Sequence, residues 1–194
     1  SIGETILREA YCDWLVKRFS IDAVNPKKNV LPLSGSREGI FSFIQSVIDP
    51  KAKSPKVLLP NPFYKIYEGA AIMAGAEPYY VNSIESEGFK PDFINIPEEV
   101  WKDCQLLILC SPSNPQGAIA DVEYWTRLLR LAETYDFKIF ADECYSEIYR
   151  DAPPPGALEV AAEIGADLER VVAFHSLSKR SNLPGLRSGF VASG

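Results

Sequence analysis

The sequence alternates short β-type apolar runs with segments whose apolar residues recur at helical spacing. Residues 106–109 (LLIL) are apolar at every position, which is typical of a strand whose two faces are both buried. Such strands belong to sheets that are covered on both sides by crossover helices. The pattern therefore predicts an α/β fold with three layers, in which helices flank a mostly parallel sheet.

The alternation extends through the whole chain, without an internal repeat or a low-complexity segment. Strands are expected at 29–33, 56–59, 77–81, 105–110, 137–141, 170–174 and 188–192. Helices are expected near 4–18, 38–47, 66–74, 122–134 and 157–164. The length of 194 residues is enough for a full hydrophobic core and by itself permits one domain or two small ones.

Charge and hydropathy argue against two classes of partner. The formal net charge is −6 and the pI is near 4.9, whereas a nucleic-acid footprint needs a basic face. No apolar run approaches the roughly 20 residues of a membrane span, and no signal peptide is visible. We expect no nucleic-acid partner and no membrane association, although a targeting segment lost from the N-terminus stays open.

The cysteine and histidine pattern argues against a metal site. Cys12, Cys104, Cys110 and Cys144 lack the paired short spacing of zinc ligands, and His175 is the only histidine. Cys110 and Cys144 lie in apolar runs, so we interpret them as small buried residues. Without signs of a disulfide framework, the expected compartment is the cytoplasm.

Polar motifs follow five of the expected strands. They occupy residues 34–37 (SGSR), 61–64 (NPFY), 111–114 (SPSN), 142–145 (DECY) and 176–179 (SLSK). In a parallel sheet, ligands bind beyond the carboxyl ends of the strands. We therefore expect these five motifs to converge on one site at a single edge of the sheet.

The most informative motif is residues 176–189 (SLSKRSNLPGLRSG), which contains Ser176, Ser178, Lys179 and Arg187. A lysine whose amine is kept partly neutral can form a Schiff base with a carbonyl. The planar guanidinium of an arginine can bind a phosphate with two hydrogen bonds. The combination favours a phosphorylated aldehyde cofactor, pyridoxal 5′-phosphate, over the alternative of an ordinary solvated basic loop.

Residues 34–37 are typical of a phosphate cradle. Gly35 permits a tight turn, and the backbone amides of Ser36 and Arg37 would point out of a helix N-terminus toward an anion. The alternative is an ordinary helix cap in which the hydroxyl of Ser34 or Ser36 binds the first turn.

Four further residues have chemistry that suits a heterocyclic cofactor. The ring of Tyr64 could stack on a planar heterocycle or pack against the neighbouring helix. Asn114, in a turn sequence, and Tyr145 could both reach a phenolic oxygen. Asp142 ends an apolar strand, where a carboxylate needs a cationic partner. That partner could be a protonated pyridine nitrogen or a nearby Lys or Arg.

Two titratable residues beside these motifs are left out of the predicted site. His175 could act as a general base, but its position before residues 176–179 favours a structural role. Glu143 should point away from Asp142, because successive side chains of a strand lie on opposite faces.

Together these motifs resemble the fold-type I, class I/II pyridoxal-phosphate aminotransferases. The matching features, in chain order, are residues 35–38 (GSRE), 61–64 (NPFY), 114–117 (NPQG), 142–145 (DECY) and 176–179 (SLSK) with Arg187. The resemblance runs through nearly the whole chain. Within this family, five segments are most similar to the subgroup of bacterial succinyldiaminopimelate aminotransferases, namely residues 31–41, 61–71, 141–149, 153–156 and 174–192.

The resemblance implies a role for each candidate residue. Lys179 would bind the cofactor covalently and then move a proton between the substrate and the cofactor. Asp142 would pair with the pyridine nitrogen, and Tyr64 would stack on the ring. Asn114 and Tyr145 would bind the phenolic oxygen. The phosphate would be held by the amides of Ser36 and Arg37 and by the side chains of Ser176, Ser178 and Arg187, with Ser178 the weakest assignment.

The same resemblance implies a reaction and its partners. The amino donor would be N-succinyl-LL-2,6-diaminopimelate and the acceptor 2-oxoglutarate, in the succinylase branch of lysine biosynthesis, with ping-pong kinetics. Members of the family are usually homodimers, so the resemblance implies a homodimer for the full-length protein. Two alternatives stay open: another class I/II aminotransferase or carbon–sulfur lyase, and a non-catalytic sensor domain on the same scaffold.

Two features depart from the family pattern. Gln116 stands where the family usually has threonine, which should affect only the shape of a turn. The chain is also about half as long as family members, so the N-terminal arm and the C-terminal small domain should be absent from it. Residues 1–194 are therefore expected to form most of the pyridoxal-phosphate-binding large domain, as in aspartate aminotransferase, and to be inactive alone.

Overall fold

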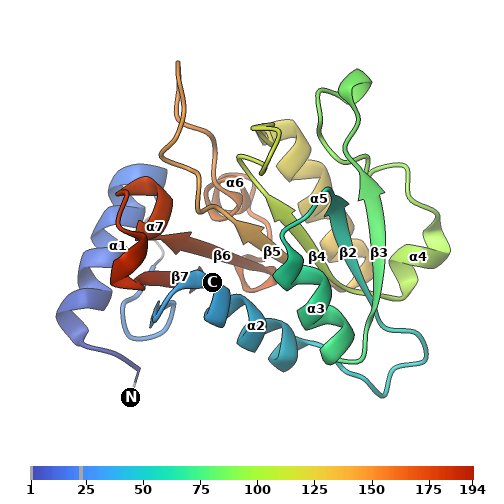
Figure 1. The fold of residues 1–194 in the computed structure, drawn as a ribbon, viewed down its shortest axis with the longest axis horizontal. Coiled ribbons are helices and arrows are strands. Elements are labelled where there is room, and N and C mark those ends of the chain that lie inside the picture. Colours follow the sequence, from blue (N-terminus) through green and yellow to red (C-terminus); the bar gives the residue numbers. More distant parts are fainter. Residues whose placement is uncertain (1, 22–23) are drawn as a thin grey trace.

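A seven-stranded sheet forms the centre of the protein (Figure 1). The computed structural model describes residues 2–21 and 24–194. The strands are β1 (Val30–Leu33), β2 (Lys56–Asn61), β3 (Glu77–Asn82), β4 (Cys104–Cys110), β5 (Lys138–Asp142), β6 (Val171–Ser176) and β7 (Gly189–Ser193), in the spatial order β1-β7-β6-β5-β4-β2-β3. β7 is antiparallel to both of its neighbours, and the other adjacent pairs are parallel. The predicted mostly parallel sheet is confirmed.

Helices cover both faces of this sheet. They are α1 (Thr5–Phe19), α2 (Ser36–Val47), α3 (Lys65–Met73), α4 (Glu98–Lys102), α5 (Val122–Tyr135), α6 (Ala157–Glu163) and α7 (Leu177–Arg180). Buried side chains of α1, α4, α5 and α6 form one core cluster with the strands. Those of α2 and α3 form a second cluster on the opposite face. The three predicted layers are therefore present.

The fully apolar strand β4 explains how both clusters form around one sheet. Leu107 and Leu109 belong to the first cluster, whereas Leu106 and Ile108 belong to the second. Successive side chains of a strand point to opposite faces, so a strand with apolar residues at every position contributes to both cores.

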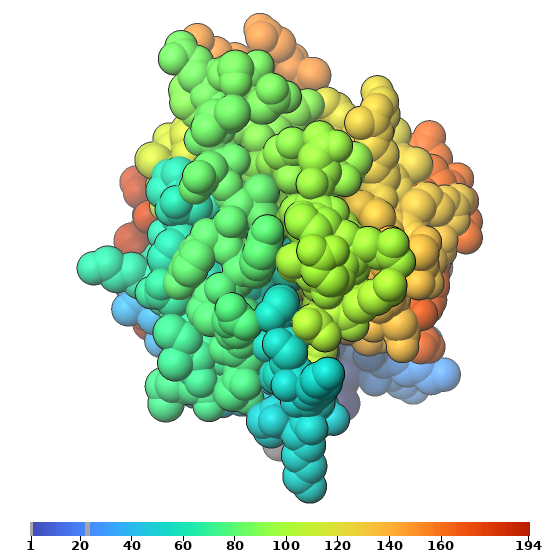
Figure 2. All heavy atoms as spheres, turned by 90° about the vertical axis from the view of Figure 1, so that its right-hand side faces the viewer, coloured from blue at the N-terminus to red at the C-terminus, as the bar shows by residue number. Residues whose placement is uncertain are grey.

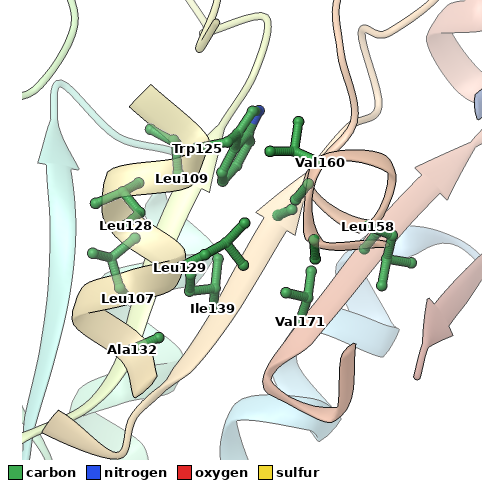
Figure 3. Close-up of a cluster of buried hydrophobic side chains, with 14 of the residues drawn as sticks. Leu107, Leu109, Trp125, Leu128, Leu129, Ala132, Ile139, Leu158, Val160 and Val171 are labelled. Atoms are coloured by element: carbon green, nitrogen blue, oxygen red, sulfur yellow. The ribbon is translucent and has the colours of Figure 1, made fainter. Parts of the chain in front are cut away.

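Helix α5 shows how the outer layer is attached. Its buried residues Trp125, Leu128, Leu129 and Ala132 recur at helical spacing, and Figure 3 shows their side chains directed toward β4 and β5. The helix begins after Asp121, whose carboxylate accepts a hydrogen bond from the amide of Tyr124 at 2.8 Å.

The sequence predicted all seven strands and the five longer helices, with small differences at their ends. It did not predict α4 or α7, because helices of five and four residues are too short to show a period. Lys179 lies in the single turn of α7.

The two ends of the sheet differ in their exposure. β3 is an edge strand whose residues Glu77, Tyr80 and Asn82 are exposed. It runs across the face shown in Figure 2, beside the segment that contains α4. The other edge strand, β1, contacts α1 and α2. The middle strands β4, β5 and β6 are the most deeply buried.

We expect Leu128→Ala to lower the free energy of unfolding by about 2–5 kcal/mol, because the fully buried side chain would leave a cavity between α5 and the sheet. The neighbouring Arg127→Ala is the control. It removes only an exposed ion pair with Glu123 and should change stability by less than about 0.5 kcal/mol. Equilibrium urea unfolding measures both values, and equal values would contradict this packing.

Candidate functional site

The five polar motifs meet around one cavity at the carboxyl edge of the sheet. The cavity has a volume of about 360 Å³. Its lining includes every residue predicted to bind the cofactor, namely Ser36, Arg37, Tyr64, Asn114, Asp142, Tyr145, Ser176, Ser178, Lys179 and Arg187. This convergence follows from topology, because the strands that precede the motifs (β1, β2, β4, β5 and β6) all point in the same direction.

One end of the cavity is formed by the N-terminus of α2. The helix begins at Ser36, and the residue before it is Gly35 with φ of 101°. Among the described residues no side chain caps this end, so the alternative of a serine cap does not apply. Its first amides are therefore free to bind an anion from the cavity.

The guanidinium of Arg187 lies directly against this helix end. Its Nη2 is 3.1 Å from Oε2 of Glu38, a half-exposed pair. A Cβ atom at Gly35 would lie 2.1 Å from the same Nη2. Glycine is therefore required at this position both for its positive φ and for the approach of Arg187. The helix end and the arginine together form a positive region suited to a phosphate.

The base of the cavity contains a buried carboxylate. Asp142 ends β5 and is 5% exposed. One oxygen accepts a hydrogen bond from the hydroxyl of Tyr67, and the other accepts from the amide of Cys144 at 3.2 Å. No Lys or Arg of the described residues forms a salt bridge with it. The alternative of a local salt bridge is therefore wrong, and a cationic ligand group would stabilise this charge.

Tyr67 is a residue of the site that the sequence patterns did not reveal. It lies on α3, is 1% exposed and lines the cavity. Burial and, next, the neighbouring Asp142 raise the pKa of its hydroxyl well above the usual value, so Tyr67 remains a hydrogen-bond donor. A signal was available: Tyr67 follows Tyr64 by three residues, which places both on one side of a helix.

Tyr64 lines the cavity from the residue that directly precedes α3. Its ring contacts Tyr67 edge-on with centroids 5.8 Å apart. Its hydroxyl accepts a hydrogen bond from Nε of Arg37 at 2.6 Å. The ring of Tyr64 therefore packs partly against Tyr67 of the neighbouring helix α3, which was the alternative to stacking on a cofactor, and it also lines the cavity. Stacking of Tyr64 on a cofactor stays a prediction.

Lys179 projects from the short helix α7 at the end of β6. The hydroxyl of Ser176 caps this helix by accepting a hydrogen bond from the amide of Ser178 at 3.1 Å. Lys179 is exposed, and within residues 2–21 and 24–194 no carboxylate lies in salt-bridge range of its Nζ. The amine is thus available at the cavity for reaction with a carbonyl ligand.

Asn114 and Tyr145 line the cavity from the loops after β4 and β5. Asn114 is exposed, whereas Tyr145 is half-buried, and burial is the main cause that raises the pKa of its hydroxyl. Both side chains can act as hydrogen-bond donors. Their predicted contact with one phenolic oxygen stays a prediction.

The described residues contain neither a membrane-spanning helix nor a metal cluster. Within them, no helix is both long and apolar enough to cross a membrane. No group of three or more His, Cys, Asp or Glu in that part of the chain is arranged to hold a metal ion. Cys12, Cys104, Cys110 and Cys144 are free and buried, and Cys110 and Cys144 line the cavity.

Comparison with known proteins identifies the family of the chain. Residues 1–193 match the family described as "Aminotransferase class I and II". The chain belongs to this family. The resemblance stated from the motifs is therefore confirmed, and members of the family use pyridoxal 5′-phosphate.

The individual relatives cover nearly the whole of the chain. It is 36% identical to an LL-diaminopimelate aminotransferase of Desulforudis audaxviator over 99% of the chain and 47% of the relative. It resembles a Neisseria meningitidis aminotransferase structure with a TM-score of 0.94, 45% identity, and coverage of 100% of the chain and 49% of that protein. A Thermus thermophilus protein, described as a probable N-succinyldiaminopimelate aminotransferase, has a TM-score of 0.87 and 30% identity, with coverage of 96% and 48%. The chain thus spans about half the length of these proteins.

The residues that line the cavity fit the family cofactor. Asp142 is a buried carboxylate without a cationic partner among the described residues, as a protonated pyridine nitrogen would require. The uncapped end of α2 beside Arg187 suits a phosphate. Lys179 offers an amine at the same cavity. One cavity thus contains groups that can bind an anion, a group that can pair with a cation, and an amine that can react with a carbonyl.

We expect Gly35→Ala to weaken binding of pyridoxal 5′-phosphate by roughly tenfold or more, because the added methyl displaces Arg187 and the positive φ is strained by about 1–3 kcal/mol. Gly185→Ala is the matched control, since nothing lies within 4 Å of a Cβ there. Absorption titration gives both dissociation constants, and circular dichroism checks folding. Unchanged affinity in a folded Gly35→Ala protein would contradict this phosphate site.

Proposed function

We propose that the full-length protein containing this chain is a pyridoxal-phosphate-dependent aminotransferase, and that residues 1–194 form most of its cofactor-binding large domain. The observation that carries the proposal is the cavity that combines buried Asp142, the α2 N-terminus with Arg187, and the amine of Lys179. Membership of the class I and II family supports the same conclusion.

The chain's own residues would hold the cofactor at both ends. The amides of Ser36 and Arg37, the hydroxyls of Ser176 and Ser178, and the guanidinium of Arg187 would bind the phosphate. Their position around the α2 N-terminus and the α7 turn supports this set. When bound, pyridoxal 5′-phosphate supplies an aldehyde that condenses with amines and a ring that withdraws electrons.

At the other end, Asp142 would stabilise the protonated ring nitrogen. Its two hydrogen bonds, from Tyr67 and from the amide of Cys144, fix the plane of the carboxylate. Asn114 and Tyr145 would donate hydrogen bonds to the phenolic oxygen, and Tyr64 would cover the ring. Each of these residues lines the cavity, which is the support for assigning them together.

Lys179 would act in two ways. Its Nζ would bind the cofactor aldehyde before the substrate arrives. The same amine would be placed to take the proton from Cα of the substrate as a general base and to return it as a general acid. Lys179 is exposed at the cavity and its Nζ forms no salt bridge among the described residues, which supports both roles because the amine is free to move.

The amino donor that we propose is a diaminopimelate derivative, with the N-succinyl form as first candidate, and the acceptor is 2-oxoglutarate. Subgroup motifs at residues 31–41 and 174–192 support the N-succinyl form. The Desulforudis relative is named for the free LL-form, so the unmodified amino acid is the second candidate. A cytoplasmic homodimer completes the proposal, and four free cysteines agree with a reducing compartment.

We expect Lys179→Ala in the full-length protein to lose both aminotransferase turnover and the visible absorption of the covalently bound cofactor. The covalent link needs the amine, and no other lysine lines the cavity within the described residues. Lys102→Ala is the control, since that lysine forms an exposed ion pair on α4. Retained visible absorption in Lys179→Ala would contradict the assignment.

We expect steady-state assays of the full-length protein to show ping-pong kinetics with 2-oxoglutarate and a higher kcat/KM for N-succinyl-LL-diaminopimelate than for aspartate or aromatic amino acids. Free LL-diaminopimelate, tested in parallel, separates the two candidate donors. Preferred turnover of cystathionine would identify a carbon–sulfur lyase instead. Cofactor binding without turnover of any amine would indicate the sensor alternative. The isolated 194-residue chain should show no turnover.

A further inference from the structure

A buried acid and the chain's only histidine face each other behind the proposed cofactor site. Glu143 follows Asp142 at the end of β5, and His175 precedes Ser176 on β6. Oε2 of Glu143 lies 3.4 Å from Nε2 of His175, and the two side chains are 3% and 2% exposed. Neither residue lines the cavity.

The surroundings of His175 are aromatic. Its ring centroid lies 5.0 Å from that of Trp14, 5.7 Å from Phe19 and 4.8 Å from Phe190. Among the described residues, no contact to either ring nitrogen has the distance and angle of an ordinary hydrogen bond. Glu143 is therefore the polar group available to Nε2, and an imidazolium would be poorly solvated here.

Glu143 has one firm partner besides His175. Its Oε1 accepts a hydrogen bond from the amide of Ala157, the first residue of α6, at 2.7 Å. Its own amide donates to the carbonyl of Phe174 at 3.0 Å, which continues the pairing of β5 with β6. This leaves Oε2 directed at the imidazole, and the question is which of the two groups holds the proton.

Charged groups on the neighbouring elements influence this pair. Arg18 of α1 and Arg180 of α7 act on His175, while Arg18, Glu159 of α6 and Asp142 act on Glu143. Arg18 is itself paired with Glu147 at 2.7 Å. Burial is the largest cause for both partners: it raises the pKa of Glu143 to about 8 and lowers the pKa of His175 to about 3.

We propose that Glu143 and His175 hold one proton as a neutral carboxylic acid–imidazole hydrogen bond, in which Oε2 of Glu143 donates to Nε2 of His175. An ion pair at this depth would place two charges in an aromatic environment without further hydrogen bonds to solvate the imidazolium. The pair connects the ends of β5 and β6 on the face opposite the cavity.

These residues are positioning residues for the site. Asp142 and Ser176 are their direct chain neighbours and point to the other face, so the acid–imidazole bond fixes the backbone from which both project. The positioning role rests on the proposed function, whereas the location of the proton on Glu143 does not.

The pair makes stability depend on pH in both directions. The folded pKa of Glu143, about 8, lies above its ordinary 4.5, so its stabilising contribution is lost as the pH rises through about 8. The folded pKa of His175, about 3, lies below its ordinary 6.5, so its contribution is lost as the pH falls through about 3. Combined, the pair stabilises the fold most between 4.5 and 6.5.

The direct test is ¹⁵N NMR of the histidine rings in the full-length protein, with the His175 signal identified by its loss in His175→Gln or its shift in Glu143→Gln. We expect a neutral imidazole signature throughout pH 5 to 7.5, within the range set by the two pKa values. An imidazolium signature at pH 7 would overturn the proposal, whether or not the protein binds a cofactor.

Glu143→Gln provides a second readout. Glutamine can donate to Nε2 and still accept from the amide of Ala157, so the protein should fold and lose the decline in stability above pH 6.5. Glu163→Gln, an exposed change on α6, should keep that decline. An unchanged decline in Glu143→Gln would overturn the assignment of the proton to Glu143.

The positioning role has its own test. Glu143→Leu keeps the volume but removes both hydrogen bonds, and it should weaken binding of pyridoxal 5′-phosphate to the full-length protein by roughly tenfold or more. Glu143→Gln should stay within about twofold of the unsubstituted protein. Equal affinity in folded Glu143→Leu would overturn the positioning role and leave the NMR result on the proton untouched.

Discussion

The shared direction of the strands that end at the cavity is the constraint on which the site depends. Parallel pairing of β6 with β5, β5 with β4 and β4 with β2 brings their carboxyl ends to one edge. β7, antiparallel to both neighbours, lets β1 end at the same edge. Residues more than a hundred positions apart, such as Arg37 and Lys179, therefore line one cavity of about 360 Å³.

The two faces of the same strand end explain why neighbouring acidic residues differ so strongly. Asp142 and Glu143 are both buried, but Asp142 faces the cavity, where a cationic ligand group could pair with it. Glu143 faces an aromatic core, where burial favours its protonated form. Two consecutive residues at the end of β5 thus lie on opposite faces of the sheet, one on the cavity side and one in the aromatic core.

Most of this architecture could be predicted from the sequence, because fully apolar strands such as residues 106–109 and polar motifs directly after strands leave clear patterns. The ten candidate residues were found in this way, and the structure brings them to one cavity. Tyr67, the one-turn helix α7 and the Glu143–His175 contact were not found. Tyr67 left only its three-residue spacing from Tyr64 as a signal, and α7 is too short to show a period. The Glu143–His175 contact depends on the packing of β5 against β6, which has no local pattern in the sequence.

We propose that the five strand ends build a pyridoxal-phosphate site in which Lys179 binds the cofactor covalently. Borohydride reduction of the full-length protein with its cofactor, followed by peptide mapping with mass spectrometry, tests it most directly. We expect the stable phosphopyridoxyl label on the peptide that contains Lys179. A label on another lysine, or no label, would contradict the account.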